Sequence, residues 1–288
     1  MDSELQVNEN DTQIHIKGRE FAYTIDKRTA LFTEMKFAGR EYLNHPMELN
    51  IWRAPTDNDM YIKSEWKKAH YDKAYTRAYT TEVVQGKHGV KIVSHASVVA
   101  ETVQKILDVT ITWKIDASGK IDADIEAAKD GEFPDLPRFG VRMFLDKKLS
   151  AVRYFGMGPQ ESYCDKHQAA SHGLYQANVD DLHEDYIRPQ ENGSHYDCEY
   201  VELNNSRYGI VVSAENAFSF NASYYTQEEL EKKTHNYELT ESDSVVFCVD
   251  YALNGIGSNS CGPVVLDQYR FDDVLFRFQF TLIPYVKG

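Results

Sequence analysis

Two carboxylates and an amide lie side by side in the segment NIWRAPTDND, residues 50–59. Asp57, Asn58 and Asp59 supply oxygen atoms of the kind that Mg²⁺ and Ca²⁺ bind, and paired carboxylates also serve in general acid–base catalysis. A calcium loop, however, needs further oxygen ligands and a glycine at its sharp turn. Asx side chains instead cap turn amides, and Arg53 can pair with a carboxylate. We therefore expect these four residues to form a structural motif, without a metal.

Two other loops share the tripeptide Pro-Gln-Glu, in GPQESY (158–163) and RPQENG (188–193). Neither has the composition of a phosphate-binding loop. Proline stiffens each loop, and a glutamate behind it can accept hydrogen bonds from buried amides. The alternative is that Glu161 and Glu191 line a polar cleft that accepts a sugar. The residues leave both interpretations open.

The segments between these loops alternate β-branched or aromatic residues with polar ones, as in QIHIKG, EFAYTID and VLFRFQFTLI. This period of two, with turn signals at close intervals, predicts a mainly β fold built from antiparallel hairpins. Short helices are expected over 61–74 and 227–234, the second preceded by a capping box. We expect residues 1–12 to be a flexible lead-in and residues 13–288 to form one large β domain.

Composition limits the classes of partner. The 288 residues are 42% hydrophobic, which is enough for a sizeable core. The net charge of −14 repels nucleic acid and anionic lipid. No apolar run is long enough for a membrane span, and the polar first residues lead us to expect no export signal. The four cysteines lack zinc-site spacing, so we expect reduced thiols in a cytoplasmic protein. They are Cys164, Cys198, Cys248 and Cys261.

Four motifs follow one another along the chain: NIWRAPTDND, YFGMGPQESYCDKH, YIRPQENG and NGIGSNSCGP. In this order they resemble the motifs of the C-terminal domain, or separate small subunit, of glycoside hydrolase family two β-galactosidases. The resemblance spans nearly the whole chain and implies a large antiparallel β-supersandwich related to galactose mutarotase. In that family the catalytic glutamates belong to a (β/α)₈ barrel, and no alternation of strands and helices here predicts a barrel.

The resemblance therefore implies a chain without catalytic residues, metal or cofactor of its own. Its partner would be the barrel domain or large subunit of the same enzyme, and its role would be to complete the active-site mouth and support assembly. The complete enzyme would be an oligomer that hydrolyses terminal β-galactosides with retention, using Mg²⁺ and a monovalent cation held in other domains.

The last motif departs from the family pattern. In lactose-cleaving members the Gly-Ile-Gly stretch leads to a tryptophan that presents an aromatic platform to the sugar, whereas the matching position here is Cys261. A thiol is small and cannot stack on a pyranose. We expect Asn259 and Ser260 to offer hydrogen bonds to substrate and Cys261 to offer a small apolar contact. The alternative for Cys261 is a buried thiol in a turn.

Two other functions stay open. A mutarotase-like aldose epimerase would need histidine and glutamate on a concave face, and His172 is a candidate beside Glu161 and Glu191, together with His167 and His195. A carbohydrate-binding module would need exposed aromatic rings. Its candidates include Trp52, Trp66 and Trp113, two of which lie in segments typical of core strands.

Overall fold

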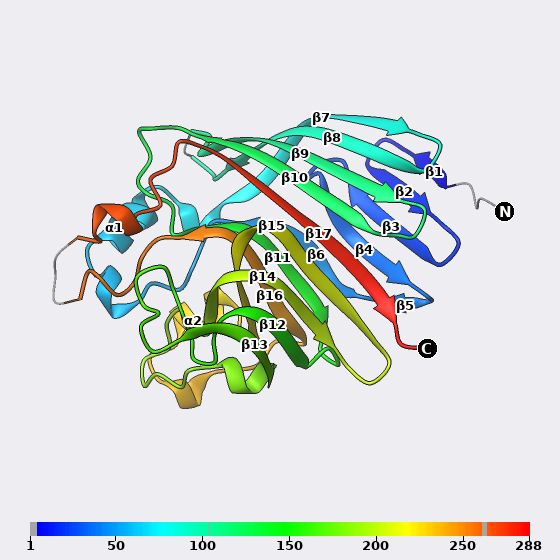
Figure 1. Ribbon diagram of the computed structural model, residues 1–288. Helices are drawn as coiled ribbons and strands as arrows, with labels where there is room; N and C mark the ends of the chain where they lie inside the picture. The colour runs from blue at the N-terminus through cyan, green and yellow to red at the C-terminus, as the bar shows by residue number, and fades with distance from the viewer. Residues whose placement is uncertain (1–4, 103, 261–263) are drawn as a thin grey trace.

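The computed structural model describes residues 5–102, 104–260 and 264–288, and its strands form two antiparallel sheets (Figure 1). The predicted mainly β fold class is confirmed. The strands are β1 (Gln6–Glu9), β2 (Gln13–Lys17), β3 (Phe21–Asp26), β4 (Leu31–Phe37), β5 (Arg40–Glu41), β6 (Leu43–Asn50), β7 (Tyr75–Gln85), β8 (Gly89–Val99), β9 (Leu107–Asp116), β10 (Ile121–Lys129), β11 (Arg138–Asp146), β12 (Ala151–Gly158), β13 (Ser171–Asn178), β14 (Ser194–Asn204), β15 (Tyr208–Ser223), β16 (Ser244–Leu253) and β17 (Leu275–Val286).

Two short α-helices, α1 (Ile62–Lys68) and α2 (Gln227–Lys232), lie outside the sheets. The helix predicted over 61–74 is too long, because His70 adopts a left-handed conformation with φ of 57° and only a 3₁₀ turn follows. The start of α2 is as predicted, since the Thr226 side chain accepts a hydrogen bond from the Glu229 amide at 3.1 Å. Within the described ranges, no helix is long and apolar enough to cross a bilayer.

The smaller sheet has the strand order β1-β2-β3-β4-β5. The larger, twelve-stranded sheet runs β13-β12-β14-β15-β17-β10-β9-β8-β7, and a branch continues from β15 through β16 and β11 to β6. Every strand pair recorded in the described residues is antiparallel. This is the arrangement that hairpin connections favour.

One hydrophobic core joins the two sheets. Alternate residues of β9 point inward, so Trp113 is fully buried and its ring lies 4.9 Å from that of Phe32 on β4. The Trp113 indole donates to the Ala30 carbonyl at 2.8 Å, and the Tyr23 hydroxyl donates to the Gly119 carbonyl at 2.7 Å. Strands of the small sheet are thus held against the large sheet by apolar packing and by paired polar tips.

The expected flexible lead-in over residues 1–12 is wrong for its described part. β1 pairs with β2 in the register Val7 to Ile16, and Leu5 is buried. An edge strand can be held by backbone hydrogen bonds alone. A polar strand such as QVNE therefore shows little of the apolar alternation by which strands are recognised in a sequence.

Candidate functional site at the loop end of the sandwich

Strand register brings the four motifs to one end of the molecule. The last residue of β6, Asn50, lies opposite Gly140 near the start of β11, and Leu253 at the end of β16 lies opposite Arg138. Ser194 begins β14 beside the same branch. The loops that leave these strand ends gather near α1, on the left in Figure 1. We call this region the loop end.

The first motif is organised around a buried ion pair. Arg53 and Asp59 are both fully buried, and Arg53 Nη2 donates to Asp59 Oδ1 at 2.8 Å. The other carboxylate oxygen accepts from the Thr56 amide at 2.8 Å, which closes the turn. Arg53 also donates to the carbonyls of Asn254 and Gly255, so the first motif is fastened directly to the fourth. Both oxygens of the Asp59 carboxylate therefore accept hydrogen bonds from groups inside the protein.

Asn58 strengthens the same connection. Its side-chain amide donates to the Ile256 carbonyl at 2.7 Å, and the Asn259 amide donates back to the Asn58 carbonyl at 2.9 Å. Asp57, by contrast, lies at the surface, where its amide donates to the Gln190 side chain at 3.1 Å. The residues in the first motif therefore contact both the third and the fourth.

Asp165, in the second motif, binds the backbone of the fourth. Its carboxylate accepts hydrogen bonds from the amides of Ile256, Gly257 and Ser258 at 2.8–2.9 Å. Burial alone would raise the pKa of Asp165, but these amide hydrogen bonds outweigh burial and hold the pKa below its ordinary value. A charged carboxylate thus fixes the Gly-Ile-Gly turn.

Glu161 binds a cation and the third motif. Its carboxylate contacts Lys166 and the Tyr186 hydroxyl and accepts from the Gly193 amide at 2.9 Å. Lys166 also donates to the Tyr186 hydroxyl at 2.9 Å. The side chain of Glu161 is only 6% exposed, so these contacts account for both of its oxygens within the protein.

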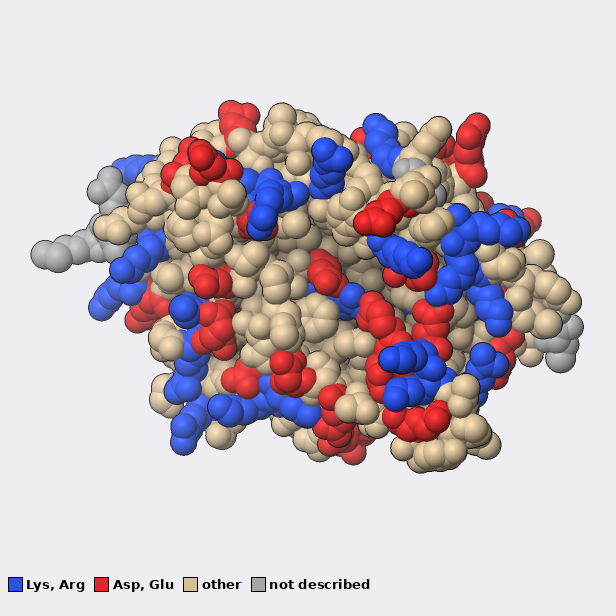
Figure 2. Space-filling model, turned by 180° about the vertical axis from the view of Figure 1, so that it is seen from behind, with Lys and Arg blue, Asp and Glu red and all other residues tan. Residues whose placement is uncertain are grey.

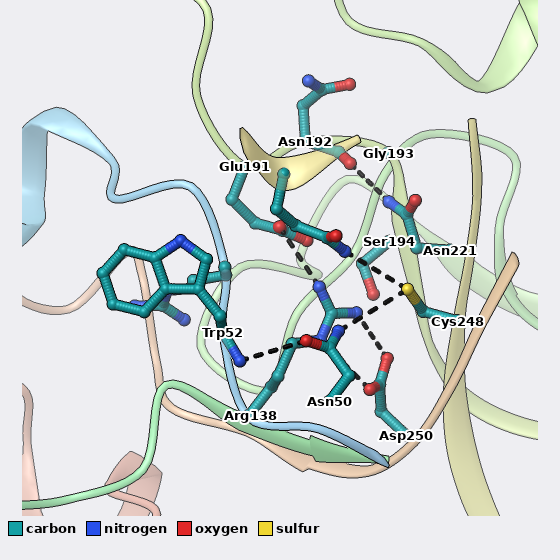
Figure 3. A network of polar contacts seen from close by, with 12 residues as sticks. Asn50, Trp52, Arg138, Glu191, Asn192, Gly193, Ser194, Asn221, Cys248 and Asp250 are labelled. Carbon is teal, nitrogen blue, oxygen red and sulfur yellow. Dashed lines mark hydrogen bonds and ion pairs between the residues drawn. The ribbon is translucent and has the colours of Figure 1, made fainter. Parts of the chain in front are cut away.

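Glu191 belongs to a buried network around Arg138 (Figure 3). Arg138 donates to both oxygens of Asp250 and, through Nη1, to Glu191 Oε2 at 3.3 Å. All three side chains are at most 3% exposed. Burial raises the pKa of Glu191, against the opposing effect of Arg138 and Arg53.

A cleft of about 510 Å³ lies where the four motifs meet. Its wall includes Asp57 and Asn58, Asp165 and Lys166, Gln190 and Glu191, and Ile256, Gly257 and Ser260. Hydroxyl, amide and charged groups on a concave wall can bind a polyhydroxylated ligand. Of the predicted polar-cleft residues, Glu191 lines this cleft, whereas Glu161 and His172 are absent from its wall.

The candidate histidines make their polar contacts with groups other than the two glutamates. His172 donates to the Asp197 carbonyl at 3.0 Å, and His167 donates to the Tyr163 carbonyl at 2.9 Å. His195 is buried, with its ring 4.5 Å from Tyr154 and 5.0 Å from Phe220. Among the described residues, no hydrogen bond or ion pair joins these histidines to Glu161 or Glu191.

The other predicted residues occupy defined places. Asn259 is buried and Ser260 is exposed on the cleft wall, while Cys261 lies outside the described residues. Cys164, Cys198 and Cys248 are free thiols, as predicted. Trp52, Trp66 and Trp113 are all buried, so none of them offers an exposed ring to a sugar.

Three residues that the sequence did not single out hold the loop end together: Arg138, Asp165 and Asp250. Asp250 had a detectable signal, because it is a lone carboxylate within the apolar run SVVFCVDYAL and must find a cation if buried. Asp165 stands within a quoted motif, but nothing local indicates that it faces backbone amides some ninety residues later.

Comparison with known proteins places these motifs in a family context. A family model described as "Beta galactosidase small chain" matches residues 17–282. The β-galactosidase of Actinobacillus pleuropneumoniae is 46% identical over 281 residues, which are 98% of this chain and 28% of that protein. The β-galactosidase of Staphylococcus xylosus is 33% identical, with the same coverage. The chain thus spans about 28% of the length of these relatives.

Among solved structures, the galactose 1-epimerase from Lactobacillus acidophilus NCFM is similar in fold. The two share a TM-score of 0.51 and 8% identity, and the match covers 100% of each chain. At this level of identity the similarity concerns the arrangement of strands.

Proposed function

Because the chain belongs to the β-galactosidase small chain family, we propose that it is the non-catalytic small subunit or C-terminal domain of a β-galactosidase. In this role it completes the mouth of an active site whose catalytic glutamates lie in another domain or chain. The substrate of the assembled enzyme is a terminal β-galactoside, and the loop-end cleft borders the position of its leaving group.

One observation carries the non-catalytic assignment. A retaining glycosidase needs two carboxyl groups ~5 Å apart that face the scissile bond, one protonated and one free to attack. At the described loop end, Asp59 is bound by Arg53 and Asp165 by three backbone amides. Glu161 is bound by Lys166 and Glu191 by Arg138. Each of these carboxylates holds a loop in place, which supports a non-catalytic role for the chain.

The remaining 72% or so of the relatives' length leaves room for a catalytic barrel, and we propose that Mg²⁺ and a monovalent cation bind there. The three free thiols support a reducing, cytoplasmic location. The assembled enzyme is proposed to be an oligomer.

The test uses the chain alone and a chimaera. In the chimaera, this chain replaces the matched segment of the Actinobacillus pleuropneumoniae β-galactosidase. We expect the chimaera to hydrolyse a chromogenic aryl β-galactoside and the isolated chain to give only the buffer rate. Turnover by the isolated chain that is lost in Glu161→Gln would contradict the proposal, because it would make Glu161 a catalyst.

A further inference from the structure

A second cavity, of about 310 Å³, has a wall separate from that of the loop-end cleft. One short turn contributes to both, because Asp165 and Lys166 line the cleft whereas Tyr163 and Cys164 line the cavity. Its volume is at the lower end of the range for small-molecule sites, about 300–1,000 Å³, and suits a ligand the size of one sugar ring. We call it the tyrosine cavity, after three tyrosines that line it together with two aspartates: Tyr196, Tyr251, Tyr269, Asp197 and Asp273.

The polar groups of the tyrosine cavity are free to bind a ligand. Among the described residues, no hydrogen bond within the protein uses the hydroxyls of its three tyrosines or the carboxylates of its two aspartates. The Asp197 side chain is 48% exposed, so a ligand can reach it from the solvent. At the loop-end cleft, by contrast, Asp165 and Glu191 are bound by protein groups. The tyrosine cavity therefore keeps both donors and acceptors unused on one concave wall.

A β-bulge in β14 directs two of these side chains. The register of β14 against β15 shifts between His195 and Cys198, so Tyr196 and Asp197 leave the regular ladder. Asp197 adopts a left-handed conformation with φ of 55°, which residues other than glycine seldom adopt. Bulges re-aim side chains next to binding sites, and backbone outliers gather at such sites. Both residues of this bulge line the tyrosine cavity.

Two neighbouring side chains hold the bulge in place. The fully buried Ser162 hydroxyl accepts a hydrogen bond from the Tyr196 amide at 2.9 Å. At the next residue, His172 Nε2 donates to the Asp197 carbonyl at 3.0 Å. The His172 ring itself packs edge-on against Phe155, with the ring centres 4.7 Å apart. His172, predicted as a polar-cleft residue, therefore supports the backbone of Asp197.

Two aromatic rings of the cavity are held by stacking on their neighbours. The Tyr251 ring lies 5.2 Å from that of Phe276, and the Tyr196 ring lies 5.7 Å from that of His167. Rings held in this way lose little freedom when a ligand binds, and the apolar C–H face of a pyranose can pack on them. Tyrosine hydroxyls donate and carboxylates accept, whereas each hydroxyl of a sugar does both. The wall therefore matches the chemistry of a sugar.

The charge of the chain favours a neutral ligand. The net charge is −14, and on the described part of the face seen in Figure 2 acidic and basic side chains are interspersed, without one large basic area. An anionic saccharide would be repelled. An organic cation could pair with the carboxylates but has no acceptor for the tyrosine hydroxyls. The mixture of donors and acceptors therefore favours an uncharged sugar.

We propose that the tyrosine cavity binds one neutral pyranose. Asp197 and Asp273 accept hydrogen bonds from its hydroxyls, and Tyr251 contacts its ring. His172 acts as a positioning residue, because it holds the backbone of Asp197. The site goes beyond the proposed function, since it gives the chain a sugar-binding activity that needs no other domain.

Saturation-transfer difference NMR of the full 288-residue chain with galactose and with glucose tests the site. We expect at least one of them to bind with a Kd of roughly 1–10 mM, which ordinary ligand efficiency implies for a molecule of this size. Asp197→Asn should weaken binding about tenfold, because it removes a charged acceptor, and asparagine tolerates the left-handed backbone. Asp57→Asn, on the wall of the loop-end cleft, is the matched control and should leave the Kd unchanged.

A second variant fills the cavity. Ala217 on β15 is exposed and lines the wall, so Ala217→Leu places a branched side chain in the cavity without disturbing the core. We expect binding to weaken by more than about tenfold, since the leucine occupies volume that the sugar needs. The Tm should stay at the wild-type value, which shows that the variant is folded.

Several results would overturn the site. They are the absence of binding by both sugars well above the expected Kd, and an unchanged Kd in both Asp197→Asn and Ala217→Leu. Loss of binding in Asp57→Asn alone would place the sugar in the loop-end cleft, and displacement of the sugar by choline would make the cavity a cation site; each contradicts the proposal. Hydrolysis by the chimaera tests the proposed function separately, so failure of one proposal is distinguishable from failure of the other.

Discussion

The guanidinium of Arg138 donates hydrogen bonds to both carboxylate oxygens of Asp250, from Nε at 3.1 Å and from Nη2 at 2.5 Å. The two residues lie on the neighbouring strands β11 and β16, and both are fully buried. A third side chain, Glu191, connects this pair to the loop that carries the second Pro-Gln-Glu motif. Strand pairing and loop position are therefore linked by one buried cation.

Arg138→Met should be strongly destabilising, because it leaves two carboxylates buried without their cation. Removal of one partner from a buried pair costs ~3–5 kcal/mol, which urea unfolding can measure. The matched control is Arg277→Met, which removes the exposed partner of Asp124 and should lower stability far less, because water and salt screen an exposed ion pair. Equal losses in the two variants would show that the buried network contributes nothing special.

Asp165→Ala should loosen the Gly-Ile-Gly turn, because three backbone amides lose their acceptor. We expect faster hydrogen exchange at Ile256, Gly257 and Ser258 and a loss of about 1–3 kcal/mol in stability. Asp165→Asn keeps one acceptor oxygen and should lie between wild type and alanine. Unchanged exchange at these three amides in the alanine variant would contradict the assigned role.

His195 should make the protein less stable in acid. Burial lowers its pKa from 6.5 to about 4, so between these values the unfolded chain binds a proton that the folded protein does not. The contribution of His195 to the free energy of unfolding is at its maximum above pH 6.5 and decreases as the pH falls toward 4. A depression of this size corresponds to a maximum of ~3 kcal/mol.

The measurement is the slope of unfolding free energy against pH in His195→Phe, which keeps an aromatic ring against Tyr154 and Phe220. The slope between pH 6.5 and 4 should flatten relative to wild type. His88→Phe, in the exposed turn between β7 and β8, is the control and should retain the wild-type slope. A wild-type slope in His195→Phe would show that another group causes the acid sensitivity.

Cys261→Trp tests whether the fourth motif reaches a sugar in the assembled enzyme. In the chimaera, we expect a lower KM for lactose and little change in kcat for an aryl galactoside, because the added ring binds the leaving group. A tenfold change corresponds to ~1.4 kcal/mol, a reasonable value for one stacked ring. Ser260→Trp places the same ring one residue away and controls for position. A lower Tm with unchanged lactose kinetics would remove Cys261 from the site.

Strands were predictable because their side chains repeat every two residues, and this period is visible in the sequence. In β9, for example, Val109, Ile111 and Trp113 point inward, and the polar residues between them point outward. The end of α1 was less predictable, since the left-handed His70 follows from how the chain turns toward β7 and not from a local breaker such as glycine or proline.

The loop end was predictable as a set of motifs but not as a set of contacts. The pairing of Arg138 with Asp250 joins positions 112 residues apart, and that of Asp165 with Ile256 joins positions 91 apart. Strand register decides the first pair, since a one-residue slip of β11 or β16 would send its side chains to the other face. The second pair joins two loops, which come together only once the strands that carry them are in place. The sequence alone therefore identifies the charged residues but not the residues with which they pair.

The fluorescence of the buried tryptophans reports on two different regions of the chain. The rings of Trp52 and Trp66 lie 6.2 Å apart beneath the loop end, with the Arg53 guanidinium 5.2 Å from the centre of the Trp66 ring. Trp113 lies in the core between the sheets. In a Trp113→Phe variant, the tryptophan fluorescence of the chain comes from Trp52 and Trp66 at the loop end. Its emission can then follow events at the loop end without any added dye.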